Sequence, residues 1–183
     1  MRGGRCTVNN IRSSAPPLVK KLMWDRKHRS NSIDPAKCPD DLLESLDPLK
    51  PDSAILDLGC GTGNLRAALR MRGWKGHFIG VDVSQVAIET ARKSEDENSE
   101  WHVSTIENFP IPTQMLDAVV FCESIYYVKQ EALSTLLRRC HQPLALGGRI
   151  ISRIWDPDEH HDYVKVLLKS GAEDSSPLYI LTK

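Results

Sequence analysis

Short apolar runs alternate with helix-like segments along residues 55–182, and this alternation is the clearest pattern in the chain. An apolar run of about four to eight residues indicates a buried strand, whereas apolar residues three and four apart indicate a helix. Repeated strand–helix units predict an α/β fold with a mostly parallel sheet and helices on both faces. The pattern predicts strands at 55–58, 77–81, 101–103, 116–121, 149–155 and 178–182, helices at 64–72, 85–93, 130–140 and 161–169, a solvated loop at 95–100 and a turn at 143–148.

The first 48 residues differ from this repeat. Helices are expected at 18–30, with Leu18, Leu22 and Met23 on one side, and at about 40–47. Residues 1–30 carry eight Lys or Arg and one acid, whereas the other residues carry 16 basic and 23 acidic side chains. We therefore divide the chain into a basic arm with lid helices (1–48) and a main domain (49–183). Residues 1–17 fit either a disordered arm or an organelle presequence, and Pro16-Pro17 count against the presequence.

The composition excludes several classes of protein. The chain has 183 residues, 40% of them hydrophobic, and no formal net charge, which is typical of one ordinary globular domain. No apolar run approaches the roughly 18–20 residues of a membrane span, so we expect no membrane partner. Five cysteines without zinc-ligand spacing indicate a reducing, cytoplasmic compartment and no metal site. The acidic main domain makes nucleic acid an unlikely partner.

A glycine-rich loop follows the first predicted strand and carries the candidate chemistry. Gly59, Gly61 and Gly63 follow Asp57 at alternate positions, and a helix begins at Asn64. Such a loop lets a ligand approach the backbone at the amino end of a helix. A dinucleotide site would have a glycine where Asn64 stands, so the spacing favours another nucleotide-like ligand.

A second acid closes the next predicted strand. Asp82 lies nineteen residues after Gly63 and would stand at the end of the neighbouring strand. Its carboxylate can accept hydrogen bonds from both hydroxyls of a ribose. The alternative is that Asp82 caps the following helix, but Ser84 is already well placed for that task.

Four segments in order resemble the class I S-adenosylmethionine-dependent methyltransferases, over about residues 50–155. They are 55–63, the strand ending at Asp82, the adenine-covering segment 104–110, and 116–124, followed by a Gly147-Gly148 turn. The resemblance implies a three-layer Rossmann-like fold, mostly parallel with an antiparallel carboxyl-terminal strand, and S-adenosylmethionine as cofactor. The cofactor-binding residues it implies are Asp57, Gly59, Cys60, Gly61, Gly63, Asp82, Val83, Thr105, Ile106 and Cys122.

The same resemblance indicates where the methyl acceptor would lie. Glu123, Tyr126 and Tyr127 follow the fourth strand and are the candidate catalytic residues, although each could equally serve the core or the backbone. Their segment is similar to that of small-molecule N-methyltransferases, including those acting on nodulation chitooligosaccharides. A small-molecule acceptor methylated on nitrogen or oxygen is therefore expected. An RNA or protein methyltransferase and a non-catalytic cofactor-binding module are the alternatives.

Three further expectations concern the ends of the chain. Residues 24–28 resemble a lid stretch of small-molecule methyltransferases, and an amphipathic helix against the sheet edge is the alternative. His160-His161 offer a base, or simply a solvated start to a helix. Only about a dozen residues follow the helix at 161–169, so we expect a trimmed sheet that ends in the single antiparallel strand 178–182. The sequence does not fix the oligomeric state.

Overall fold

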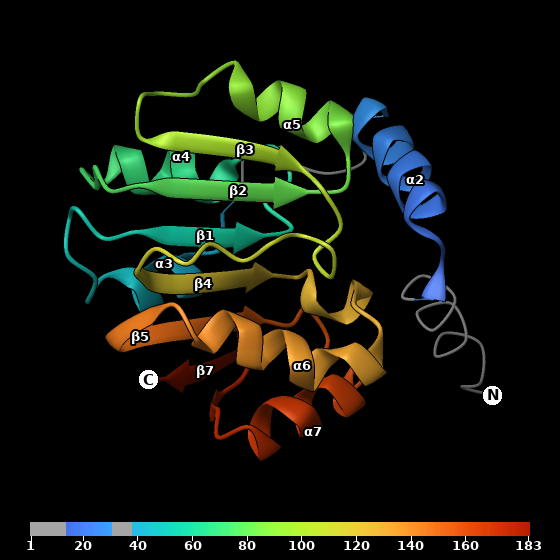
Figure 1. Cartoon of the computed structure of the whole chain (residues 1–183), viewed down its shortest axis with the longest axis vertical. Helices are drawn as coiled ribbons and strands as arrows, with labels where there is room; N and C mark the ends of the chain where they lie inside the picture. Colours follow the sequence, from blue (N-terminus) through green and yellow to red (C-terminus); the bar gives the residue numbers. More distant parts are fainter. Residues whose placement is uncertain (1–13, 31–37) are drawn as a thin grey trace.

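The computed structural model describes residues 14–30 and 38–183 (Figure 1). The expected disordered arm at 1–17 lies largely outside this range. The strands are β1 (Ile55–Leu58), β2 (Phe78–Asp82), β3 (Ser99–Val103), β4 (Leu116–Cys122), β5 (Leu144–Arg153), β6 (Glu173–Ser175) and β7 (Leu178–Thr182). The helices are α2 (Pro17–Arg29), α3 (Asp40–Leu46), α4 (Asn64–Met71), α5 (Gln85–Arg92), α6 (Gln130–His141) and α7 (His161–Lys169), with a 3-10 turn, η1 (Ile125–Tyr127).

The strands form one sheet in the order β3-β2-β1-β4-β5-β7-β6. The first five are parallel, and β7 runs antiparallel to β5. Successive residues of β1 face opposite sides, so that Leu56 joins a core with α6 and α7 while Ile55 joins a core with α3, α4 and α5. Figure 1 shows α6 and α7 in front of the sheet and α3 and α4 behind it. The predicted three-layer fold is confirmed.

The carboxyl-terminal end of the sheet is more complete than expected. A seventh strand, β6, pairs antiparallel with β7, so the prediction of a sheet ending in one antiparallel strand was wrong. All three residues of β6 are polar and exposed, and only backbone pairing identifies the strand. The expected turn at 143–148 is also part of the sheet, because β5 begins at Leu144 and shifts register opposite β4 before Arg149.

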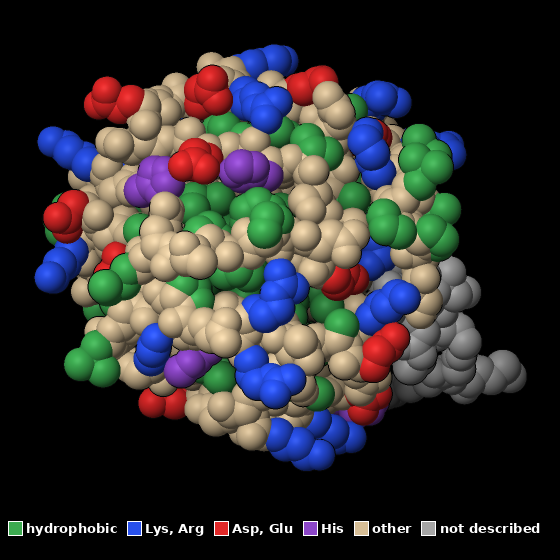
Figure 2. Space-filling view, in the orientation of Figure 1, with side chains coloured by type: hydrophobic (Ala, Val, Ile, Leu, Met, Phe, Trp, Pro, Cys, Tyr) green, Lys and Arg blue, Asp and Glu red, His purple; other side chains and the backbone are tan. Residues whose placement is uncertain are grey.

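Helix α2 lies at nearly the predicted residues, but its apolar side faces solvent. Leu18 and Leu22 are 66% and 60% exposed, whereas Lys20 and Asp25 are buried. The buried face meets mainly polar groups, which does not fit the alternative of an amphipathic helix packed by its apolar side against the sheet edge. Figure 1 places α2 beside α5, at the carboxyl ends of β1, β2 and β3, and Figure 2 shows hydrophobic side chains gathered over α2.

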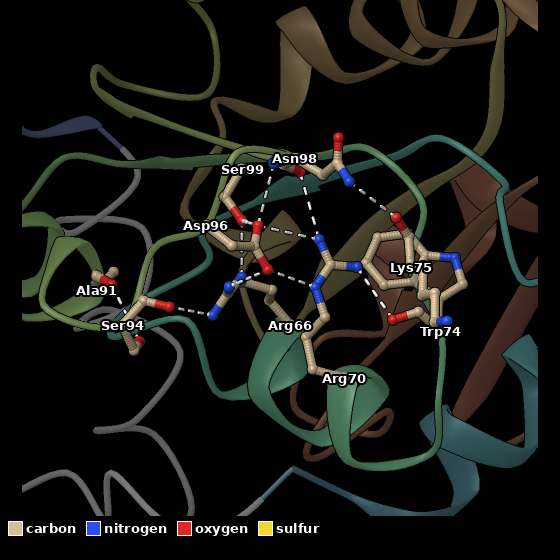
Figure 3. A network of polar contacts seen from close by, with 9 residues as sticks. All are labelled: Arg66, Arg70, Trp74, Lys75, Ala91, Ser94, Asp96, Asn98 and Ser99. Carbon is tan, nitrogen blue, oxygen red and sulfur yellow. Dashed lines mark hydrogen bonds and ion pairs between the residues drawn. The ribbon is translucent and has the colours of Figure 1, made fainter.

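The expected solvated loop at 95–100 is anchored to α4 (Figure 3). Asp96 accepts hydrogen bonds from Arg66 at 2.5 Å and from Arg70 Nε at 2.8 Å. Ser99 also donates to it, and together these donors outweigh the effect of burial and hold the pKa of Asp96 well below its usual value. The network anchors the start of β3, one of the two edge strands of the sheet. In the described part of the chain, no helix is long and apolar enough to cross a membrane.

Candidate functional site

Two adjoining cavities lie at the carboxyl ends of the parallel strands. The first, of about 300 Å³, is lined by Asp82 at the end of β2, by Val83 and Ile106 in the loops after β2 and β3, and by Trp24 and His28 of α2. The second, of about 630 Å³, extends past the glycine-rich loop to the start of α3 and the end of β5. The two cavities share five lining residues: His28, Gly59, Gly61, Cys122 and Glu123. Ligands of open parallel sheets bind at such strand ends.

The glycine-rich loop is tied to β2 and leads directly into α4. The backbone N–H groups of Gly59 and Cys60 donate to Val81 O at 2.7 and 3.0 Å. Gly59, Cys60 and Gly61 line the cavities, and burial raises the pKa of the Cys60 thiol. Gly63 lines neither cavity. It has φ +84°, and a Cβ there would lie 2.6 Å from the ring of Trp101, so close packing explains this glycine.

Asp82 is held at the edge of the first cavity. One carboxylate oxygen accepts from Gly61 N at 3.0 Å and the other from Ser84 N at 2.7 Å. Burial raises the pKa of Asp82, and these two N–H donors partly oppose that rise. Ser84 itself caps α5 by accepting from Ala87 N at 3.2 Å, as the sequence predicted. Asp82 therefore keeps acceptor capacity for a ligand, because each carboxylate oxygen can accept more than one hydrogen bond.

Asp57 is a buried acid with an unsatisfied oxygen. Its side chain is 1% exposed, it lines the second cavity, and its Oδ1 has no hydrogen-bond partner among the described residues. Burial, with a further contribution from the negative charge of Asp82, raises the pKa of Asp57 to about 8. A buried polar atom without a partner is costly, so this oxygen is suited to a cationic donor supplied by a ligand.

Three segments of the predicted nucleotide pocket occur together. Thr105 and Ile106 line the first cavity with Val83, and Thr105 Oγ1 accepts from Asn108 N at 3.3 Å. Cys122 lines both cavities, and burial raises the pKa of its thiol. All the predicted cofactor residues except Gly63 therefore line one or both cavities.

Glu123 lies between the two cavities in a strained conformation. Its φ is 55°, which non-glycine residues rarely adopt. Its carboxylate pairs with Arg153 Nη1 at 2.5 Å, and Arg153 Nε pairs with Asp41 of α3 at 2.9 Å. One guanidinium thus joins α3, the end of β4 and the end of β5.

The two tyrosines of η1 form the wall of the first cavity. Tyr126 stacks on His160 with ring centroids 3.9 Å apart and an interplanar angle of 3°. Burial is the main reason that the pKa of Tyr126 lies above its usual value, which keeps the phenol protonated. Tyr127 meets Trp24 edge-on at 5.0 Å. His160 is buried in this stack, so the expectation of a solvated helix start fails at that residue.

Sequence reasoning missed several residues that shape the cavities. Lys20 of α2 donates to Glu107 and to the backbone oxygen of Tyr127, both at 2.9 Å. Arg153 and Asp41 were not singled out either, because an isolated charged residue gives no motif. Within residues 14–30 and 38–183, no group of three or more His, Cys, Asp or Glu is arranged to hold a metal ion.

Comparisons with known proteins agree with this geometry. The ribosomal protein L11 methyltransferase of Methylobacillus flagellatus is 31% identical over 135 residues, which cover 73% of this chain and 43% of that protein. The ubiquinone/menaquinone biosynthesis C-methyltransferase UbiE of Vibrio cholerae is 33% identical over 110 residues, which cover 56% of this chain and 41% of that protein. This chain therefore spans less than half the length of these relatives.

Solved structures share the fold. Magnesium protoporphyrin IX methyltransferase from Synechocystis PCC 6803, solved with bound S-adenosylmethionine, superposes with a TM-score of 0.66 and 14% sequence identity, over 92% of this chain and 97% of that one. At this identity the likeness concerns the fold alone. The family described as "Methyltransferase domain" matches residues 55–148, which include the glycine-rich loop, Asp82 and Glu123. The chain belongs to this methyltransferase domain family.

Proposed function

We propose that this chain transfers a methyl group from S-adenosylmethionine to a nitrogen or oxygen of a small-molecule acceptor. The observation that carries the proposal is the unpartnered Oδ1 of Asp57 in the second cavity, next to the glycine-rich loop and one strand away from Asp82. These carboxylate acceptors fit the cofactor, which presents an ammonium group and two ribose hydroxyls as donors.

The residues present suggest how the cofactor would be held. Asp57 would accept from the ammonium group, and Asp82 from the ribose hydroxyls. Ile106 and Val83 would pack against the adenine, and Thr105 offers a hydroxyl nearby. The N–H groups at the start of α4 favour a carboxylate. When bound, the cofactor supplies an electrophilic sulfonium methyl group, so the protein has chiefly to orient the acceptor and exclude water.

The acceptor side is formed by Cys122, Glu123 and the tyrosines. Tyr126 serves as a wall rather than a base, because its raised pKa keeps the proton on the phenol at neutral pH. The carboxylate of Glu123 is oriented by Arg153 and can accept a hydrogen bond from an acceptor amine or hydroxyl. Helix α2 acts as the lid, since its Trp24, Lys27 and His28 line the first cavity.

A macromolecular acceptor is the second candidate. The relatives include enzymes named for a ribosomal protein and for ribosomal RNA. The acidic main domain disfavours RNA through charge repulsion. A non-catalytic cofactor-binding module is the third candidate, and it would keep the same Asp57, Asp82 and cavity glycines.

Calorimetry with S-adenosylmethionine and S-adenosylhomocysteine tests the cofactor. We expect both to bind with one site per chain, and no binding of either would refute the proposal. Incubation of whole-cell extracts with isotopically labelled cofactor, followed by separation of small molecules, RNA and protein, then tests the acceptor. Label in a small molecule would support the proposal, whereas label found only in RNA or protein would favour the second candidate.

A further inference from the structure

The outer face of α2 combines exposed apolar and basic side chains. Leu18, Val19 and Leu22 are 66%, 51% and 60% exposed. Arg26 and Arg29 follow one and two turns later on the same side and are also exposed. Val19, Leu22 and Arg26 line a shallow groove of about 550 Å³. Figure 2 shows the hydrophobic side chains over α2 with Lys and Arg beside them. We call Leu18, Val19, Leu22, Arg26 and Arg29 the outer face of α2.

The charge on this face has one sign. Asp25 is the only acid of α2, and it is turned inward, where it is 3% exposed and accepts hydrogen bonds from Ser84 Oγ and Val86 N. Lys21 pairs with Asp25 at 2.8 Å. No acidic side chain within α2 therefore offsets Arg26 and Arg29 on the outer face. The chain beyond residue 30 has the opposite balance, with 16 basic and 23 acidic residues.

We propose that the outer face of α2 docks on an anionic membrane surface. Exposed apolar side chains can enter the headgroup region of a bilayer, and nearby Lys or Arg attract anionic lipids, so the apolar and the electrostatic contributions add. Negative lipids attract this face and repel the acidic remainder, so the charge asymmetry allows a single orientation. A peripheral contact of this kind differs from the sequence-based expectation of no membrane partner, which rested on the lack of a spanning segment.

Docking would place the first cavity close to the lipid. The same helix supplies Trp24, Lys27 and His28 to that cavity. The inference does not depend on methyl transfer, because binding to vesicles can be measured without cofactor or acceptor.

Co-sedimentation of the full chain with vesicles tests the proposal. One set contains phosphatidylcholine alone, and the other contains equal parts of phosphatidylcholine and phosphatidylglycerol. We expect binding to the mixed vesicles only, weakening as salt is raised. Replacing both arginines (Arg26→Gln with Arg29→Gln) should lower the affinity about 25-fold, since each basic side chain near an anionic surface contributes about fivefold. Leu18→Ser with Leu22→Ser should lower it about tenfold or more through lost apolar contact.

A matched control replaces exposed apolar residues elsewhere. Met71 and Leu146 are 88% and 95% exposed on other elements, so Met71→Ser with Leu146→Ser should bind vesicles like the wild type. Circular dichroism and calorimetric cofactor affinity check that each variant folds. If the leucine variant does not fold, the arginine variant alone decides the test. Equal binding to both vesicle types, or equal loss in the control, would overturn the proposal. So would self-association that disappears in the leucine variant while no vesicle binding is seen, because the face would then join two copies of the chain.

Discussion

Replacing Asp57 by Asn should abolish a pH dependence of cofactor binding that the structure predicts. The carboxyl is buried and has a pKa of about 8, so it is protonated at pH 7 when no ligand is bound. A bound ammonium group favours the ionised form. Binding therefore releases a proton below pH 8, and affinity for S-adenosylmethionine rises with pH.

The size of the change in affinity depends on how far the pH lies below the pKa of Asp57. Ionising a group one unit below its pKa costs about 1.4 kcal/mol, which is about tenfold in affinity. Between pH 5.5 and 7.5 the Kd of the wild type should fall by about two orders of magnitude. The range stops at pH 7.5 because an α-amino group begins to lose its own proton at about 7.7–8.0. Calorimetry in two buffers of different ionisation enthalpy would report the released proton directly.

Two variants separate Asp57 from its neighbours. Asp57→Asn should bind weakly with a Kd that does not change over this range, because an amide cannot ionise. His28→Gln is the matched control, since His28 also lines both cavities and should leave the slope intact. A flat wild-type profile, or a slope that survives in Asp57→Asn, would refute the assignment of Asp57 to the ammonium group.

The other predictions concern Asp82, Gly63 and Asp96. Asp82→Ala should weaken S-adenosylmethionine binding by about 100-fold in calorimetry, since two charge-assisted hydrogen bonds are lost; wild-type affinity would remove the ribose assignment. Gly63→Ala should destabilise the chain by about 2–4 kcal/mol in urea unfolding, through the left-handed φ and the collision with Trp101. Gly73→Ala is its control, with φ +85° and no neighbour within 4 Å, and should cost about 1 kcal/mol; equal losses would contradict the packing role. Asp96→Ala should cost about 1 kcal/mol at pH 7, since its side chain is partly exposed. Because the folded-state pKa of Asp96 is lowered, that difference from wild type should shrink as pH falls below about 4, and a constant difference would disprove the linkage.

Local patterns were enough to predict six of the seven strands, the main helices and a set of residues that line the two cavities. The glycine-rich loop and Asp82 are recognisable because their chemistry depends on neighbours in sequence. Gly63 belongs to the same motif, yet a glycine is needed there because a Cβ would collide with Trp101 on another strand. The sequence pattern did not separate a glycine facing a ligand from a glycine facing the core.

The features that were not predicted depend on residues far apart in the chain or on backbone pairing alone. The burial of Lys20 and Asp25 was not predicted, because their partners Glu107 and Ser84 lie far along the chain. Strand β6 carries no apolar residue and could not be found from hydrophobic periodicity. Arg153 acts through Asp41 and Glu123, which only the folded chain brings together.

The polar anchoring of α2 has a consequence for how this helix opens. Its two buried charged side chains pair with polar groups, Lys20 with Glu107 and Asp25 with Ser84, while Leu18 and Leu22 are mostly exposed to water. Apart from the ring of Trp24, which meets Tyr127, detaching α2 would expose little additional apolar surface, so the opening free energy should depend only weakly on urea. Amide hydrogens of residues 17–29 should accordingly exchange by a local, denaturant-insensitive route that salt accelerates, while those of β1 and β4 exchange only through global unfolding.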